Sequence, residues 1–208
     1  MVVEVDISKM NNKNYDIFNN NNLTSILNCD GFGEWYEIVS PILSTEEFQK
    51  RKLMKHHDES VWDHCVMVSY YAFKYSKRFK ANSRNCAIAG LMHDFYPHAW
   101  QYSKSLEKLD KSYSYYFLPG SKKPTFFHQH GFIHAREAKE NFKKYYNKLS
   151  NKRIDNAILR HMFPLNIIPP RYKEGWIVTL ADKVVSFKNL PSIKEWPKYL
   201  GIRKSKKF

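Results

Sequence analysis

The chain has 208 residues, and its 34 Lys and Arg against 20 Asp and Glu give a formal charge of +14. A chain of this length most simply forms one domain with a sizeable core. Its content of 43% hydrophobic and 16% aromatic residues excludes a disordered chain. The charge favours anionic partners such as nucleotides, phosphorylated metabolites or nucleic acid. A general bias toward Lys and Asn would produce the same charge without any partner.

Three scattered cysteines, Cys29, Cys65 and Cys86, form no Cys-x-x-Cys pair, so neither a disulfide framework nor a zinc knuckle is indicated. The N-terminus lacks a basic segment followed by an apolar run, so no signal peptide is expected. No stretch approaches the ~20 apolar residues that cross a bilayer. We therefore expect a cytoplasmic protein with no membrane partner, and the sequence leaves its oligomeric state open.

The first helical signals are expected only after an N-terminal extension. Residues 1–43 include an Asn-rich stretch at 11–22 that offers little to bury. Ser44 is followed by Glu47 at the spacing of a capping box. Residues 60–79 then carry apolar side chains at steps of three and four, which predicts one face of a helix.

A second long helix is expected over residues 83–94, with Ser83 as N-cap and Pro97 preventing its continuation. Residues 96–127 show no long period and predict an aromatic-rich loop. Further helices are predicted at 131–149, 152–162 and 174–187. No strand pattern is visible, so the predicted fold is all-α. Residues 44–208 form the predicted helical domain, which ends in a basic tail.

Several of the nine histidines lie where the predicted helices end or pack. His64 lies in the first long helix, and His93-Asp94 ends the second. Asp182 interrupts the apolar run of the last helix, where a charged carboxylate costs free energy unless something pairs with it. A metal ion, Lys183 or a helix cap would be such a partner. Imidazole and carboxylate ligands suit iron, manganese or zinc.

Five segments in this order resemble the HD superfamily of metal-dependent phosphohydrolases: His64, the Ala-Gly-Leu-Met-His-Asp segment 89–94, His130-Gly131 before Ala135, the Ile-Leu-Arg-His segment 158–161, and Leu-Ala-Asp-Lys at 180–183. The resemblance covers about residues 55–190. It implies an HD-domain helical bundle and a phosphohydrolase whose catalytic residues include His93 and Asp94.

The further histidines resemble the two-metal branch of this superfamily, which includes bacterial diadenosine tetraphosphate hydrolases of the HD type. By this resemblance, one ion is held by His64, His93, Asp94 and Asp182, and Asp94 bridges to a second ion held also by His130 and His161. His134 lies one helical turn after His130 on the same face and stays the alternative ligand. Two ions ~3.5–4 Å apart can clamp a phosphate and activate a water without a protein nucleophile.

The candidates for binding substrate phosphate are Arg160 and Lys183, which adjoin proposed ligands, and His98. Many two-metal relatives carry a lysine shortly after the His-Asp pair, where this chain has Phe95-Tyr96-Pro97. This departure puts the substrate contacts of the loop in doubt. The Gly-Tyr-Pro motif of cyclic-dinucleotide phosphodiesterases is missing, so that branch is disfavoured.

The predicted function is therefore metal-dependent hydrolysis of a phosphate ester or anhydride in a small anionic substrate, most simply a nucleotide. A nucleic-acid phosphodiesterase is the first alternative, supported by the basic charge but by no RNA-binding motif. A non-catalytic, metal-containing nucleotide-binding module is the second.

Overall fold

The computed structural model describes residues 26–56, 59–97 and 130–188. Its elements in chain order are α2 (Phe32–Leu43), α3 (Glu46–Gln49), η3 (Lys50–Leu53), β1 (Lys55–His56), β2 (Glu59–Ser60), α4 (Val61–Arg78), α5 (Ser83–Met92), α7 (His130–Tyr146), η5 (Asn147–Leu149), α8 (Lys152–Arg160) and α9 (Lys173–Lys188). The all-α class is confirmed. The described residues also contain β1 and β2, an antiparallel pair of two-residue strands that the sequence did not predict. No described helix is long and apolar enough to cross a membrane.

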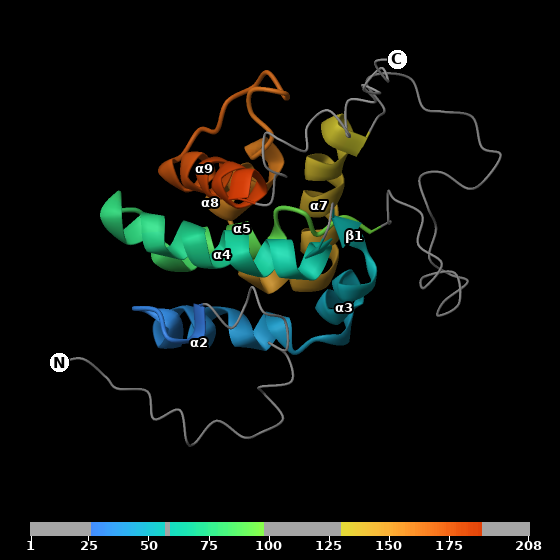
Figure 1. Cartoon of the computed structure of the whole chain (residues 1–208). Helices are drawn as coiled ribbons and strands as arrows, with labels where there is room; N and C mark the ends of the chain where they lie inside the picture. Colours follow the sequence, from blue (N-terminus) through green and yellow to red (C-terminus); the bar gives the residue numbers. More distant parts are fainter. Residues whose placement is uncertain (1–25, 57–58, 98–129, 189–208) are drawn as a thin grey trace, which may run out of the picture.

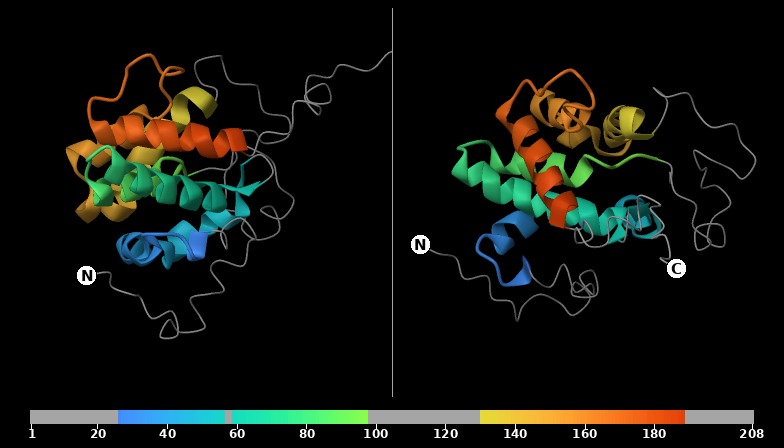
Figure 2. Two further views of the ribbon diagram at one scale, coloured as in Figure 1. Left: turned by 60° about the vertical axis from the view of Figure 1, so that its left-hand side comes forward. Right: turned by 45° about the horizontal axis from the view of Figure 1, so that its top comes forward.

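The helices form a layered bundle around α4 and α5, which lie side by side at its centre (Figure 1). Helix α2 lies on one side of this pair, while α8 and α9 cover the other, as the further views also show (Figure 2). Helix α7 packs against α8. Each long helix thus contributes one face to a common core.

Helix α4 begins where it does because Ser60 and Asp63 form a capping box. The Ser60 Oγ accepts from the Asp63 backbone N–H at 3.1 Å, and the Asp63 carboxylate accepts from the Ser60 N–H at 3.4 Å. The predicted capping box at Ser44 is not formed. Helix α3 begins one residue later, and Thr45 Oγ1 accepts from Phe48 N–H.

The cap of α5 also differs from the predicted one. Asn82, and not Ser83, caps this helix through its Oδ1, which accepts from the Asn85 N–H at 2.8 Å. Asparagine and serine are equally good N-caps, so their order in the sequence did not distinguish them.

Helix α2 lies in the stretch for which the sequence predicted no helix. Its residues Trp35, Val39 and Ile42 are buried. The Trp35 Nε1 donates a hydrogen bond to Ser69 Oγ on α4 at 2.9 Å. The helical core therefore begins before residue 44.

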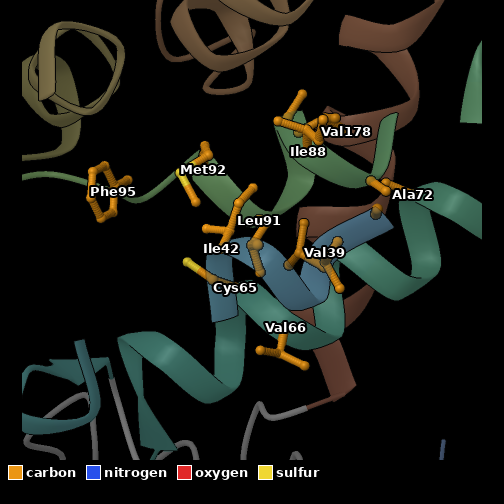
Figure 3. Close-up of a cluster of buried hydrophobic side chains, with 14 of the residues drawn as sticks. Val39, Ile42, Cys65, Val66, Ala72, Ile88, Leu91, Met92, Phe95 and Val178 are labelled. Carbon is orange, nitrogen blue, oxygen red and sulfur yellow. The ribbon is translucent and has the colours of Figure 1, made fainter. Parts of the chain in front are cut away.

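Apolar side chains of four helices pack together in the core. Figure 3 shows Ile42 of α2, Cys65 of α4, Leu91 of α5 and Val178 of α9. Phe95, just after the His-Asp pair, is buried in the same cluster. Full burial of each such large side chain contributes about 1.5–3 kcal/mol. The segment that carries the His-Asp pair is thereby anchored on the core.

Gly90→Ala is expected to lower the free energy of unfolding by about 2 kcal/mol, because overpacking of a tight contact costs about 1–3 kcal/mol. A Cβ at Gly90 would lie 2.9 Å from the Cα of Ser69 and 3.2 Å from the Cβ of Ala72. Urea unfolding measures the loss. Gly131→Ala is the control, because among the described residues its Cβ would meet only the end of the Leu165 side chain, at 3.3 Å. Equal losses in both variants would contradict a tight α4–α5 contact.

Candidate metal centre

Side chains from five helices or helix ends converge in the middle of the bundle. They are His64 of α4, His93 and Asp94 after α5, His134 of α7, His161 directly after α8, and Asp182 of α9. The four histidines are at most 4% exposed and Asp94 is 5% exposed. Such a density of buried polar groups requires partners.

The first group consists of His64, His93 and Asp94, whose nearest ligand atoms all lie within 4.8 Å of one another. The Nε2 atoms of His64 and His93 are 3.3 Å apart, and His93 Nε2 lies 3.5 Å from Asp94 Oδ2. Asp182 joins this group from α9, because its Oδ1 lies 3.1 Å from His64 Nε2 and 3.7 Å from His93 Nε2.

The second group consists of Asp94, His134 and His161, which also bring one ligand atom each within 4.8 Å. Asp94 Oδ1 lies 3.3 Å from His134 Nε2 and 3.6 Å from His161 Nε2. Asp94 therefore belongs to both groups, with Oδ2 toward His93 and Oδ1 toward His134 and His161.

Backbone carbonyls hold three of these rings in one tautomer. The Nδ1 atoms of His93, His134 and His161 lie 2.7–2.8 Å from the carbonyl oxygens of Gly90, His130 and Ile158. A carbonyl oxygen only accepts, so each Nδ1 carries the hydrogen and each neutral ring keeps its lone pair on Nε2. These Nε2 atoms are the ones that face the cluster.

The donor set fits a divalent metal ion. The Nε2 atoms of His134 and His161 lie 3.0 Å apart, and two lone pairs facing each other at that distance repel unless a positive charge lies between them. A histidine that donates through one nitrogen to an outer partner and binds a metal through the other is the usual arrangement in metal sites. Imidazole and carboxylate together suit iron, manganese or zinc.

The electrostatics of the first group also call for positive charge. Burial acts to lower the pKa of His93, but the charge of Asp94 and the nearby Asp182 carboxylate outweigh it and hold that pKa well above its usual range. Burial acts to raise the pKa of Asp182, yet its hydrogen bond with His64 and the nearby His93 ring hold that pKa well below its usual range. A proton or a metal ion between these groups satisfies both carboxylates.

The pKa of His161 is shifted in the opposite direction to that of His93. Burial, followed by the charges of His93 and His134, lowers its pKa to about 3. The ring is therefore neutral at neutral pH, which is the form that binds metals.

The structure brings together five of the six ligands predicted from the sequence, and His130 belongs to neither group. Its ring stacks on that of His134 at 4.7 Å between centroids and meets the Tyr96 ring edge-on at 4.6 Å. Because the His130 carbonyl binds His134 Nδ1, the Nε2 of His134 is the one directed at Asp94. The geometry favours the alternative ligand, His134.

Two of the three residues predicted to bind substrate phosphate, Lys183 and Arg160, lie in the described part of the chain. The Lys183 ammonium donates to the Phe163 carbonyl at 2.8 Å, on the connection between α8 and α9. Arg160 is the last residue of α8 and is partly exposed beside His161. His98 and the aromatic-rich loop after Pro97 lie outside the described residues.

Glu59 of β2 is a residue of this region that the sequence did not suggest. Its Oε1 lies 3.3 Å from His64 Nδ1, and its side chain is 9% exposed. Burial acts to lower the pKa of His64, but the hydrogen bond with Asp182 and the nearby Glu59 carboxylate outweigh it and raise that pKa. No helical periodicity relates Glu59 to His64, because Glu59 lies on β2, before the Ser60 cap at which α4 begins.

A comparison with known protein families covers the region that holds the two ligand groups. Residues 61–186 match the family model of the HD domain. That range begins at the first residue of α4 and ends within α9, so it contains both ligand groups. A search of curated proteins found no match.

Proposed function

The chain belongs to the HD domain family of metal-dependent phosphohydrolases, and from that premise we propose that it hydrolyses a phosphate ester or anhydride of a nucleotide at a two-metal centre. The observation that carries this proposal is the pair of ligand groups that share Asp94. A carboxylate shared by two sets of imidazoles would allow two ions to be held close together, as in two-metal sites, where they lie ~3.5–4 Å apart.

The proposed ligands divide between two ions. His64, His93, Asp94 and Asp182 would hold the first, and Asp94, His134 and His161 the second. Iron, manganese and zinc suit this set. When bound, such a pair polarises a phosphate and lowers the pKa of a water that attacks phosphorus.

The chain's own side chains supply the rest of the proposed chemistry. The carbonyl bonds to Nδ1 keep the rings of His93, His134 and His161 oriented, so little reorganisation is needed when ligands bind. We assign phosphate binding to Arg160 and Lys183, since the first precedes His161 and the second follows Asp182. The formal charge of +14 raises the local concentration of anionic substrates.

The substrate class follows from the motif pattern, which resembles that of HD-type diadenosine tetraphosphate hydrolases. Dinucleoside polyphosphates are therefore the first substrates to test, followed by nucleoside mono-, di- and triphosphates and a generic phosphodiester. Hydrolysis of the phosphodiester or of RNA in preference to all nucleotides would favour the nucleic-acid alternative.

His134→Ala is expected to lower the metal content from about two equivalents to about one and to slow nucleotide hydrolysis by more than about 100-fold, since even outer partners of ligands contribute 10–100-fold. His130→Ala, the matched variant one turn earlier, is expected to keep both ions. Elemental analysis of tag-free protein and initial rates measure the two effects.

The opposite pattern, with metal lost only in His130→Ala, would transfer the second site to His130. Wild-type protein that takes up no iron, manganese or zinc would refute the two-metal centre. Metal-loaded protein that leaves every nucleotide untouched would refute the substrate class.

A further inference from the structure

Glu59 faces the Nδ1 side of the His64 ring, and Asp182 and His93 face its Nε2 side. The Glu59 Oε1 approaches Nδ1 at 3.3 Å, while Nε2 of the same ring faces Asp182 Oδ1 at 3.1 Å and His93 Nε2 at 3.3 Å. Both carboxylates can only accept, so the metal-free ring can direct a hydrogen at either one; when Nε2 gives its lone pair to a metal ion, the hydrogen of the neutral ring lies on Nδ1, facing Glu59. The ring is fully buried and Glu59 is 9% exposed, so water screens the contact weakly.

His64 differs in this respect from the other histidines of the cluster. Those of α5, α7 and α8 direct Nδ1 to a carbonyl one turn earlier in their own segment. His64 stands in the first turn of α4, and its Nδ1 faces a side chain delivered from the preceding strand.

The local fold fixes the backbone of Glu59 and separates it from its acidic neighbour. Glu59 pairs with His56 in the β1–β2 ladder. Asp63 lies one residue before His64, but its Oδ2 accepts from Ser60 Oγ at 2.6 Å and from the Ser60 N–H at 3.4 Å. The Asp63 carboxylate therefore takes part in the cap of α4, and the Glu59 carboxylate is the one that contacts His64 Nδ1.

We propose that Glu59 is a positioning residue for the metal ligand His64, holding Nδ1–H so that Nε2 points at the ion. Its charge also matters, because two divalent ions bring four positive charges against the two negative charges of Asp94 and Asp182. Glu59 offsets part of the excess and makes the imidazole a stronger ligand. This inference rests on the proposed metal centre, and Glu59 lies outside the matched family segment 61–186.

Zinc binding to the full chain tests the proposal, with Zn²⁺ as the probe and a chromophoric chelator as competitor. Glu59→Ala is expected to weaken the tighter zinc site by about 10–100-fold, the usual effect of losing an outer partner of a ligand. Glu59→Gln is expected to fall between wild type and Glu59→Ala, because its amide oxygen still accepts from Nδ1–H but carries no charge. Asp63→Asn is the control, expected to lower thermal stability and leave zinc affinity within about 3-fold of wild type.

A second readout follows the tautomer of His64 itself. Long-range proton–nitrogen spectra of the zinc-loaded protein are expected to show a slowly exchanging Nδ1–H of His64 in wild type and in Glu59→Gln. In Glu59→Ala that signal is expected to broaden into exchange with water. A purely structural role of Glu59 would lower stability without moving this signal.

The proposal is overturned if Glu59→Ala binds zinc as tightly as wild type, or if Asp63→Asn loses as much affinity. Neither measurement needs turnover, so the role of Glu59 can be refuted without refuting the proposed hydrolase function, and the reverse. A protein that binds zinc through an Nδ1-protonated His64 but hydrolyses no nucleotide would refute the proposed function and keep the role of Glu59.

Discussion

Asp94→Asn is expected to remove both metal ions and to reduce nucleotide hydrolysis by far more than about 100-fold, the upper range for losing a mere outer partner. Asp94 is the residue common to the two ligand groups. Its Oδ2 faces His93 Nε2 at 3.5 Å and its Oδ1 faces His134 Nε2 at 3.3 Å. Asparagine keeps the volume, but it carries no charge and replaces one oxygen by a donor that cannot bind a cation.

The measurement is metal content by elemental analysis, with initial rates on the same samples and circular dichroism to verify helix content. Asp155→Asn makes the same chemical change far along the chain, where Asp155 pairs with Lys143 at 2.8 Å. That variant is expected to keep both ions. An Asp94→Asn protein with two bound equivalents would show that the shared carboxylate does not bridge the ions.

The helices of the family domain could be predicted because their apolar residues recur at helical spacing. Residues 60–79 and 83–94 were expected as helices, and α4 and α5 occupy Val61–Arg78 and Ser83–Met92. Helix α2 was missed although Trp35, Val39 and Ile42 have the same spacing. The first helical signals were expected near Ser44, after the Asn-rich stretch. Pro41 lies inside α2, where proline is unfavourable, and packing against α4 and α5 outweighs that cost.

The candidate site could be predicted to the level of motifs, and its ring orientations could not. His130 and His134 lie one turn apart on one face of α7, so residue type and spacing treat them alike. The proposed choice depends on which Nε2 reaches Asp94, and the bond of a backbone carbonyl to His134 Nδ1 favours His134. The contact of Glu59 with His64 depends on a strand-to-helix turn, which leaves no period in the sequence.

Arg51→Met is expected to lower the free energy of unfolding by about 3 kcal/mol, because removing one member of a buried polar pair leaves the others unsatisfied. Arg51 is 1% exposed. Its guanidinium donates to the Glu47 carboxylate at 3.1 Å and to the Tyr96 carbonyl at 3.0 Å, and lies 4.0 Å from the centre of the Phe95 ring. It thus clamps the segment that follows Asp94.

Part of this loss is expected to depend on pH. Burial acts to raise the pKa of Glu47, but the hydrogen bond from Lys50 and the charge of Arg51 outweigh it and lower that pKa. A lowered pKa in the folded state stabilises the protein at pH values above the unfolded pKa of Glu, and this contribution is lost as pH falls through the folded pKa. The difference between Arg51→Met and wild type should therefore shrink in acid.

Urea unfolding at neutral and acidic pH measures both effects, with Lys50→Met as the matched control. Lys50 binds the same carboxylate at 3.1 Å, but its side chain is 34% exposed, so its removal should cost less than about 1 kcal/mol. The excess loss in Arg51→Met then reports the buried contacts with Tyr96 and Phe95. Equal losses in the two variants would instead place the stabilisation in the charge of Glu47, and the segment after Asp94 would owe its position to apolar packing alone.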